Sequence, residues 1–205
     1  MACVMFLKED SELILLLVNT IVRDLLSSHA LEANMALMTA TYLIPKEMSG
    51  MILPTIIDKA MSHSKDFIRK KALICLEQIA IRDPLTYNDM IMEHVVVSLS
   101  DKDPGVAMVA VQVLNRLSWQ NMDKSSQHSV MNSVIGIQEQ ILEHKLPKEY
   151  TFHGTSAPWA QMDILKLLED LCDSDRLTAE ECDKVVGLVI NTLQQVHLAI
   201  NIQCL

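Results

Sequence analysis

A pattern of small and apolar residues recurs along this chain at intervals near 40 residues. Each copy places such residues at a first position, four residues later and three residues after that. The copies are Ala36-Ala40-Leu43, Ala72-Leu76-Ile79, Ala110-Leu114-Leu117 and Ile164-Leu168-Leu171, whose first residues lie 36, 38 and 54 residues apart. This spacing puts each copy on one helix face, and a period near 40 is typical of solenoids that bury such faces between neighbouring units. We therefore predict an all-α fold, a HEAT/armadillo-like α-solenoid of helical pairs.

Prolines and polar residues mark where the helices of such a solenoid begin and end. Proline is tolerated in the first turn of a helix, as expected at Pro104 and Pro158, and the run Thr178 to Glu181 matches a capping box. At Pro54 the pattern allows two interpretations, a helix that begins at Leu53 or one that kinks there. The predicted helices span residues 11–26, 32–43, 50–63, 65–81, 86–100, 104–119, 126–144, 158–172 and 178–198.

The pattern predicts one domain over residues 1–205, interrupted by a longer inter-helix loop at about 145–157. Long loops in a compact array are often functional. The loop contains Tyr150 and Phe152, which could cover the side of the solenoid or form part of a binding loop. Covering is the favoured interpretation.

Charge and cysteine content restrict the classes of partner and compartment. The formal charge of −9 opposes general attraction to nucleic acid or to an anionic membrane. The apolar run Leu13 to Val18 follows acidic residues and is too short to span a membrane, so we expect neither a signal peptide nor an anchor. Five scattered cysteines indicate reduced thiols in the cytosol; they are Cys3, Cys75, Cys172, Cys182 and Cys204.

The sequence predicts no catalytic, cofactor-binding or metal-binding residue. The seven histidines stand far from one another and from paired cysteines, and no glycine-rich phosphate loop or nucleophile elbow is present. The nearest approach to a Cys/His group is Cys172, Cys182 and His197, whose flanking residues do not look like a nucleophile site. A cysteine-dependent hydrolase is therefore the weakest hypothesis, and it requires a thiol of depressed pKa.

One basic cluster, Lys65, Arg69, Lys70 and Lys71, lies at the start of a predicted helix. It could contact a lipid head group or an acidic partner, because a helix N-terminus favours phosphate. The alternative is that the neighbouring Ile68 faces the core while the charges face water. We favour the second interpretation.

Two separated groups of motifs resemble the trunk of the adaptin large-chain family, and in particular its epsilon-type members from the fourth adaptor complex. The resemblance covers about residues 11–205, and the motifs agree in order and spacing. The first group is Lys46-Glu-Met48, Leu53-Pro-Thr-Ile-Ile-Asp-Lys59, His63-Ser-Lys65 and Arg69-Lys-Lys-Ala72. The second group is Lys145-Leu-Pro-Lys-Glu-Tyr150, Ala157-Pro-Trp-Ala-Gln161 and Ile164-Leu-Lys-Leu-Leu168.

The resemblance implies a non-catalytic scaffold subunit of a heterotetrameric vesicle coat adaptor complex. Its partners would be a beta-type large chain, a medium chain that reads cargo signals and a small chain cradled by the trunk. It also implies recruitment by an Arf-family GTPase, peripheral membrane association through the complex, and cargo sorting at the trans-Golgi network from the cytoplasm. The alternative is an unrelated HEAT or armadillo scaffold, such as a transport receptor or a phosphatase regulatory subunit.

The chain also departs from the family pattern. The family trunk continues on both sides of these 205 residues, so we expect a fragment, a truncated isoform or a divergent copy. By the same resemblance, Ala160 replaces the larger apolar residue usual in the family's Ala-Pro-Trp motif, and Asp163 is acidic where family members are typically neutral or basic.

Overall fold

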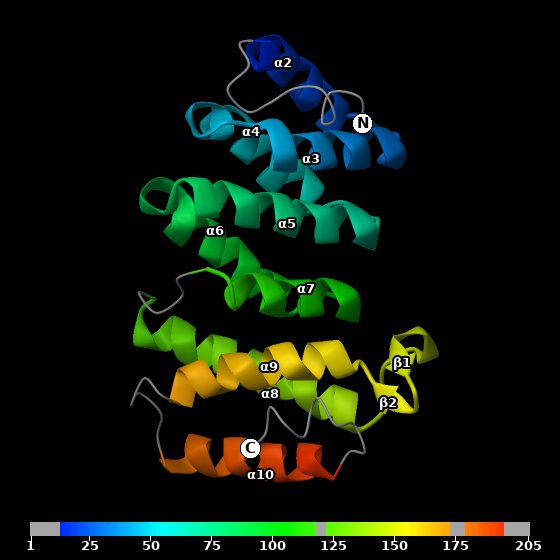
Figure 1. Cartoon of the computed structure of the whole chain (residues 1–205), viewed down its shortest axis with the longest axis vertical. Coiled ribbons are helices and arrows are strands. Elements are labelled where there is room, and N and C mark those ends of the chain that lie inside the picture. The colour runs from blue at the N-terminus through cyan, green and yellow to red at the C-terminus, as the bar shows by residue number, and fades with distance from the viewer. Residues whose placement is uncertain (1–12, 118–121, 173–178, 195–205) are drawn as a thin grey trace. The chain divides into compact units, whose positions relative to one another are not determined.

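The structure, a computed structural model, describes residues 13–117, 122–172 and 179–194 (Figure 1). Successive helices run back and forth and stack in pairs, so the predicted all-α solenoid of helical pairs is confirmed. The elements are α2 (Leu13–Leu25), α3 (Ala30–Leu43), the 3-10 turn η1 (Lys46–Met48), α4 (Ser49–Thr55), the π-helical turn η2 (Ile56–Ala60), α5 (Asp66–Arg82), α6 (Pro84–Ser98), α7 (Pro104–Leu114), α8 (Lys124–Leu142), the 3-10 turn η4 (Lys148–Tyr150), β1 (Thr151–Phe152), β2 (Thr155–Ser156), α9 (Pro158–Cys172) and α10 (Ala179–Leu193).

The chain forms two compact units, Met1–Ser98 and Leu99–Leu205. In the first unit α3 packs beside both α2 and α5, and α5 packs beside α6. In the second unit α9 packs beside α7 and α8, and α10 packs beside α8 and α9. All twelve residues of the recurring pattern are buried, with at most 7% of any of them exposed. The pattern therefore marks the core-facing side of α3, α5, α7 and α9, as predicted.

The helix borders follow from capping chemistry. Asp103 accepts a hydrogen bond from the Val106 backbone amide at 3.1 Å, and Asp123 accepts one from Ser126 at 3.1 Å. Each carboxylate satisfies an amide that has no partner within the helix, and Pro104 occupies the first turn, where its missing N–H costs nothing. The borders of α7 and α8 are therefore encoded locally. The predicted capping box begins at Thr178, which lies outside the described residues.

Of the two interpretations of Pro54, a helix that begins at Leu53 is wrong, and a kink at this residue stays a prediction. Helix α4 begins at Ser49, continues through Pro54, and passes into the wider π-helical turn η2. Proline lacks an N–H and its ring crowds the carbonyl four residues earlier, so the regular ladder is disrupted at this point. A widened turn directly after the proline is the observed result.

Arg82 at the end of α5 joins two neighbouring helices of the first unit. Its guanidinium donates hydrogen bonds to the carbonyl oxygens of Thr41 (2.9 Å) and Ile44 (3.0 Å) at the end of α3. A cation at a helix C-terminus satisfies orphan carbonyls and complements the helix dipole. Beside it Lys46 forms an ion pair with Asp83 at 3.1 Å. The C-terminal ends of α3 and α5 are therefore held together by polar contacts as well as by the core.

The connection between α8 and α9 is an ordered hairpin. Thr151 pairs with Ser156 and Phe152 with Thr155. The two turn residues, His153 and Gly154, both have positive φ, 47° and 84°, as a tight two-residue hairpin turn requires. The expectation that Phe152 covers the solenoid is wrong, since this side chain is exposed and its ring meets His153 edge-on. Tyr150 is half-buried.

Behind the hairpin, a buried amide network links three helices of the second unit. Gln138 on α8 donates from Nε2 to Gln161 on α9 and to Thr192 on α10, each at 3.1 Å. Gln161 in turn donates to the carbonyl oxygen of Ser156 at 2.7 Å. Because buried polar groups are costly unless paired, this network favours one alignment of α8, α9, α10 and the hairpin over others.

Candidate interaction surface

Helix α3 is apolar on both sides, although only one side is buried. Its core side carries the small residues of the recurring pattern. On the opposite side the apolar residues recur at intervals of four, three and four; they are Leu31, Met35, Met38 and Tyr42. Leu31 is 75% exposed and Tyr42 57% exposed, while Met38 is half-buried. A surface helix normally carries polar residues on its outer face, so this second apolar stripe needs an explanation.

Helix α5 repeats the outer stripe 36 residues later. Phe67 and Ile74 occupy the positions equivalent to Leu31 and Met38, the polar Gln78 stands at the position equivalent to Tyr42, and Ile81 lies about one turn after Gln78. Phe67 and Ile81 are exposed and Ile74 is half-buried. Because α3 and α5 pack side by side and run in the same direction (Figure 1), the two stripes form one surface.

We call this surface the α3/α5 face. Its apolar members are Leu31, Met35, Met38, Tyr42, Phe67, Ile74 and Ile81. Contiguous exposed apolar patches of this kind mark contact sites for other proteins, whereas isolated exposed side chains need no explanation. Methionine, tyrosine and phenylalanine are also enriched at protein interfaces. The face can thus bind a protein surface, and it carries no arrangement suited to catalysis.

The sequence interpretation missed this face, although the signal was present. The four apolar residues of α3 recur at the spacing of one helix side. Read together with Ala36 and Ala40 on the opposite side, they show a helix with two apolar sides, which polar residues such as Asn34 and Thr39 separate. The spacing does not by itself tell whether a second apolar side is covered by another repeat or faces outward. That requires the structure.

The basic cluster is not simply a solvated face. Arg69 is 5% exposed, so the prediction that it faces water is wrong. Its guanidinium donates a hydrogen bond at 2.8 Å to the carbonyl oxygen of His63, in the turn that precedes α5. Lys70 forms an ion pair with Asp66 at 2.9 Å, and Lys65 is exposed. Lys71 lies on the α3/α5 face, at the position equivalent to Met35.

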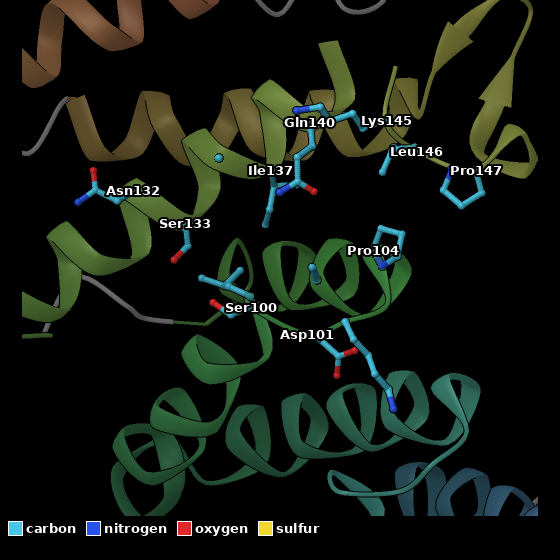
Figure 2. A pocket seen from close by; sticks show the side chains of 14 residues that line it. Ser100, Asp101, Pro104, Asn132, Ser133, Ile137, Gln140, Lys145, Leu146 and Pro147 are labelled. Atoms are coloured by element: carbon cyan, nitrogen blue, oxygen red, sulfur yellow. The ribbon is translucent and has the colours of Figure 1, made fainter. Parts of the chain in front are cut away.

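A hollow of about 540 Å³ lies within the second unit (Figure 2). On one side it is lined by the turn before α7, including Ser100 and Asp101. On the other it is lined by α8, with Ile137 and Gln140, and by the start of the hairpin connection. Its lining mixes charged, amide and apolar groups without converging polar atoms, and Asp101 already accepts a hydrogen bond from the backbone amide of Asp103. The hollow therefore shows no preference for one ligand class.

The described cysteines and histidines do not assemble into a reactive site. Burial raises the pKa of the Cys75 thiol to about 11, the opposite of the depression that a nucleophilic thiolate needs. Cys172 and Cys182 are exposed, on α9 and α10, and His197 lies outside the described residues. Within residues 13–117, 122–172 and 179–194, no three metal-ligating side chains come together, and no helix is long and apolar enough to cross a membrane.

Comparison with known proteins decides the family. The family model for the adaptin N-terminal region matches residues 1–205. This chain belongs to the adaptin family. A crystal structure described as an engineered protein shares the fold of this adaptin chain. Its TM-score is 0.53 with 14% identity, over 91% of this chain and 76% of the other.

Relatives of this adaptin chain are large subunits of adaptor complexes. It is 36% identical over 182 residues to the AP-4 complex subunit epsilon-1 of Mus musculus, covering 88% of this chain and 16% of the relative. It is 32% identical over 187 residues to the AP-4 complex subunit epsilon of Arabidopsis thaliana, covering 91% and 20%. With the AP-2 complex subunit alpha of Schizosaccharomyces pombe the identity is 25%, covering 82% and 19%. The adaptin chain thus spans a fifth or less of the length of these relatives.

Proposed function

We propose that this chain is a non-catalytic scaffold subunit of an epsilon-type, heterotetrameric vesicle coat adaptor complex. In this proposal residues 1–205 form one partial adaptin trunk solenoid. It acts in intracellular protein transport and cargo sorting at the trans-Golgi network, as a cytoplasmic subunit peripheral to the membrane. Its partners are a beta-type large chain, a medium chain and a small chain, and an Arf-family GTPase recruits the complex. The similarity to AP-4 epsilon subunits supports this choice over an unrelated HEAT or armadillo scaffold.

The observation that carries the proposal is the α3/α5 face. A scaffold subunit must expose apolar surface that a partner buries, because burial of apolar area drives most protein association. On this face the outer stripes of two adjacent helices are largely apolar, and Leu31 and Tyr42 are more than half exposed. We assign this face to the small chain, the subunit that the trunk of a large chain would cradle.

Co-expression with the beta, medium and small chains tests the proposal. We expect the small chain to co-purify with the wild-type chain, and Leu31→Asp to abolish this, because burying an unpaired carboxylate in an apolar contact is costly. Leu85→Asp on α6 is the matched control, since Leu85 is 98% exposed and lies outside the face. Failure of the wild-type chain to retain any adaptor subunit would refute the proposal. Equal losses from both variants would refute the assignment of the face.

A further inference from the structure

One charged residue, Lys71, and one uncharged polar residue, Gln78, lie among the apolar residues of the α3/α5 face. Lys71 stands on α5 between Phe67, one turn before it, and Ile74, nearly one turn after it. The equivalent position on α3 is the apolar Met35. Lys71 is half-buried, so its stem already packs against the surface, and a partner that covers the face must cover Lys71 as well.

Lys71 differs from its neighbour in its electrostatic surroundings. Lys70 is neutralised by Asp66 at 2.9 Å. In the part of the chain that the structure describes, Lys71 forms no ion pair with any carboxylate. Among the described residues no counter-charge therefore compensates the water that a partner on the face would remove from its ammonium group.

An ammonium that loses its water without gaining a counter-charge weakens binding severely. We propose that the partner surface covering the α3/α5 face carries an aspartate or glutamate carboxylate opposite Lys71, within a largely apolar contact. This inference rests on the proposed function, and it adds the chemistry that selects the partner. Lys71 is then a specificity-determining residue, because an otherwise similar apolar surface without the carboxylate would be rejected.

The substitution Lys71→Met separates this proposal from simple apolar docking. Methionine is the residue at the equivalent position of α3, so it suits the face. If the partner presents a carboxylate, the variant leaves that carboxylate buried and unpaired, and we expect affinity for the small chain to fall at least about tenfold. If the partner is wholly apolar, or if Lys71 bends to the rim of the contact, affinity stays unchanged or rises.

The measurement is the dissociation constant of the small chain for the 205-residue chain, obtained by calorimetry. Lys71→Arg keeps the charge and should bind within about threefold of wild type. Lys59→Met, an exposed lysine outside the face, should not change affinity. Circular dichroism of each variant checks folding; because Lys71 is not in the core, we expect wild-type helicity.

The outcomes separate the two proposals. Undiminished affinity of Lys71→Met overturns the carboxylate proposal and leaves the proposed function standing. Absence of binding by the wild-type chain refutes both. A dimer of this chain, detected by sedimentation and dispersed by Leu31→Asp, would show that a second copy occupies the face and would overturn the carboxylate proposal. Tenfold or greater loss in Lys71→Met, with both controls unchanged, supports it.

Discussion

Arg82 offers the most direct test of how the first unit is held together. Its guanidinium bonds two carbonyl oxygens at the end of α3, those of Thr41 and Ile44, from the end of α5. Replacement by methionine removes the charge and the donors while retaining most of the stem that packs against the helices. The variant therefore isolates the contribution of the polar contact from that of side-chain packing.

The expected loss can be estimated from these bonds. Hydrogen bonds to a charged group contribute about 1.5–3 kcal/mol each, and the favourable interaction with the C-terminus of α3 adds about 0.3–1 kcal/mol. Arg82 is half-buried and water can partly replace it. We therefore expect the free energy of local unfolding of α3 and α5 to fall by about 2–3 kcal/mol in total.

Native-state hydrogen exchange measures this quantity locally, which matters in a chain with two compact units. A loss of 2–3 kcal/mol corresponds to about 30- to 150-fold faster exchange of the slowest amides of α3 and α5. Arg23→Met is the control, since Arg23 is largely exposed and, among the described residues, forms its ion pair with the neighbouring Asp24. Acceleration below about threefold in Arg82→Met would refute the reasoning, as would an equal effect of Arg23→Met.

Three further predictions concern single side chains. Cys75, with its pKa raised to about 11 by burial, should be alkylated at neutral pH only after unfolding, whereas Cys172 should react in the native chain; mass spectrometry of alkylated peptides checks both. Burial raises the pKa of Asp163, although the nearby charges of Lys166 and Arg116 act in the opposite direction. The ionised carboxylate therefore destabilises the folded state at neutral pH, and protonation removes this penalty as the pH falls. Asp163→Asn should therefore raise the melting temperature at pH 7, with a gain that shrinks on acidification; a lower melting temperature at pH 7 would contradict this. Gly154→Ala should destabilise the hairpin by about 1 kcal/mol, because φ is 84° there. Faster exchange of the Ala157 amide, which donates to the Tyr150 carbonyl oxygen at 2.7 Å, would report it.

The core side of the solenoid could be predicted because it obeys a local rule. Ala36, Ala72 and Ala110 recur at one register position, and small or apolar residues at spacings of four and three can only be buried together on one helix side. Prolines and aspartates at helix starts carry similarly local information, as the cap of α7 by Asp103 shows.

The candidate surface and the polar contacts could not be predicted in the same way. Arg69 looks like a surface residue in the sequence, and its burial depends on the path of the preceding turn, whose His63 carbonyl it bonds. Phe152 looks like core material, but the hairpin turn directs it outward. For Leu31 and Tyr42 the spacing shows one helix side, and only the stacking of α3 beside α5 shows that this side is exposed.

Site-specific photo-crosslinking tests the central claim most directly. A photoreactive residue at Met38, within the α3/α5 face, should crosslink to the small chain in the assembled complex. The same residue at Leu85 on α6 should not, although that position is more exposed. Crosslinking at Met38 alone is the result that our account predicts. An assembled complex that crosslinks the small chain at Leu85 but not at Met38 would contradict it.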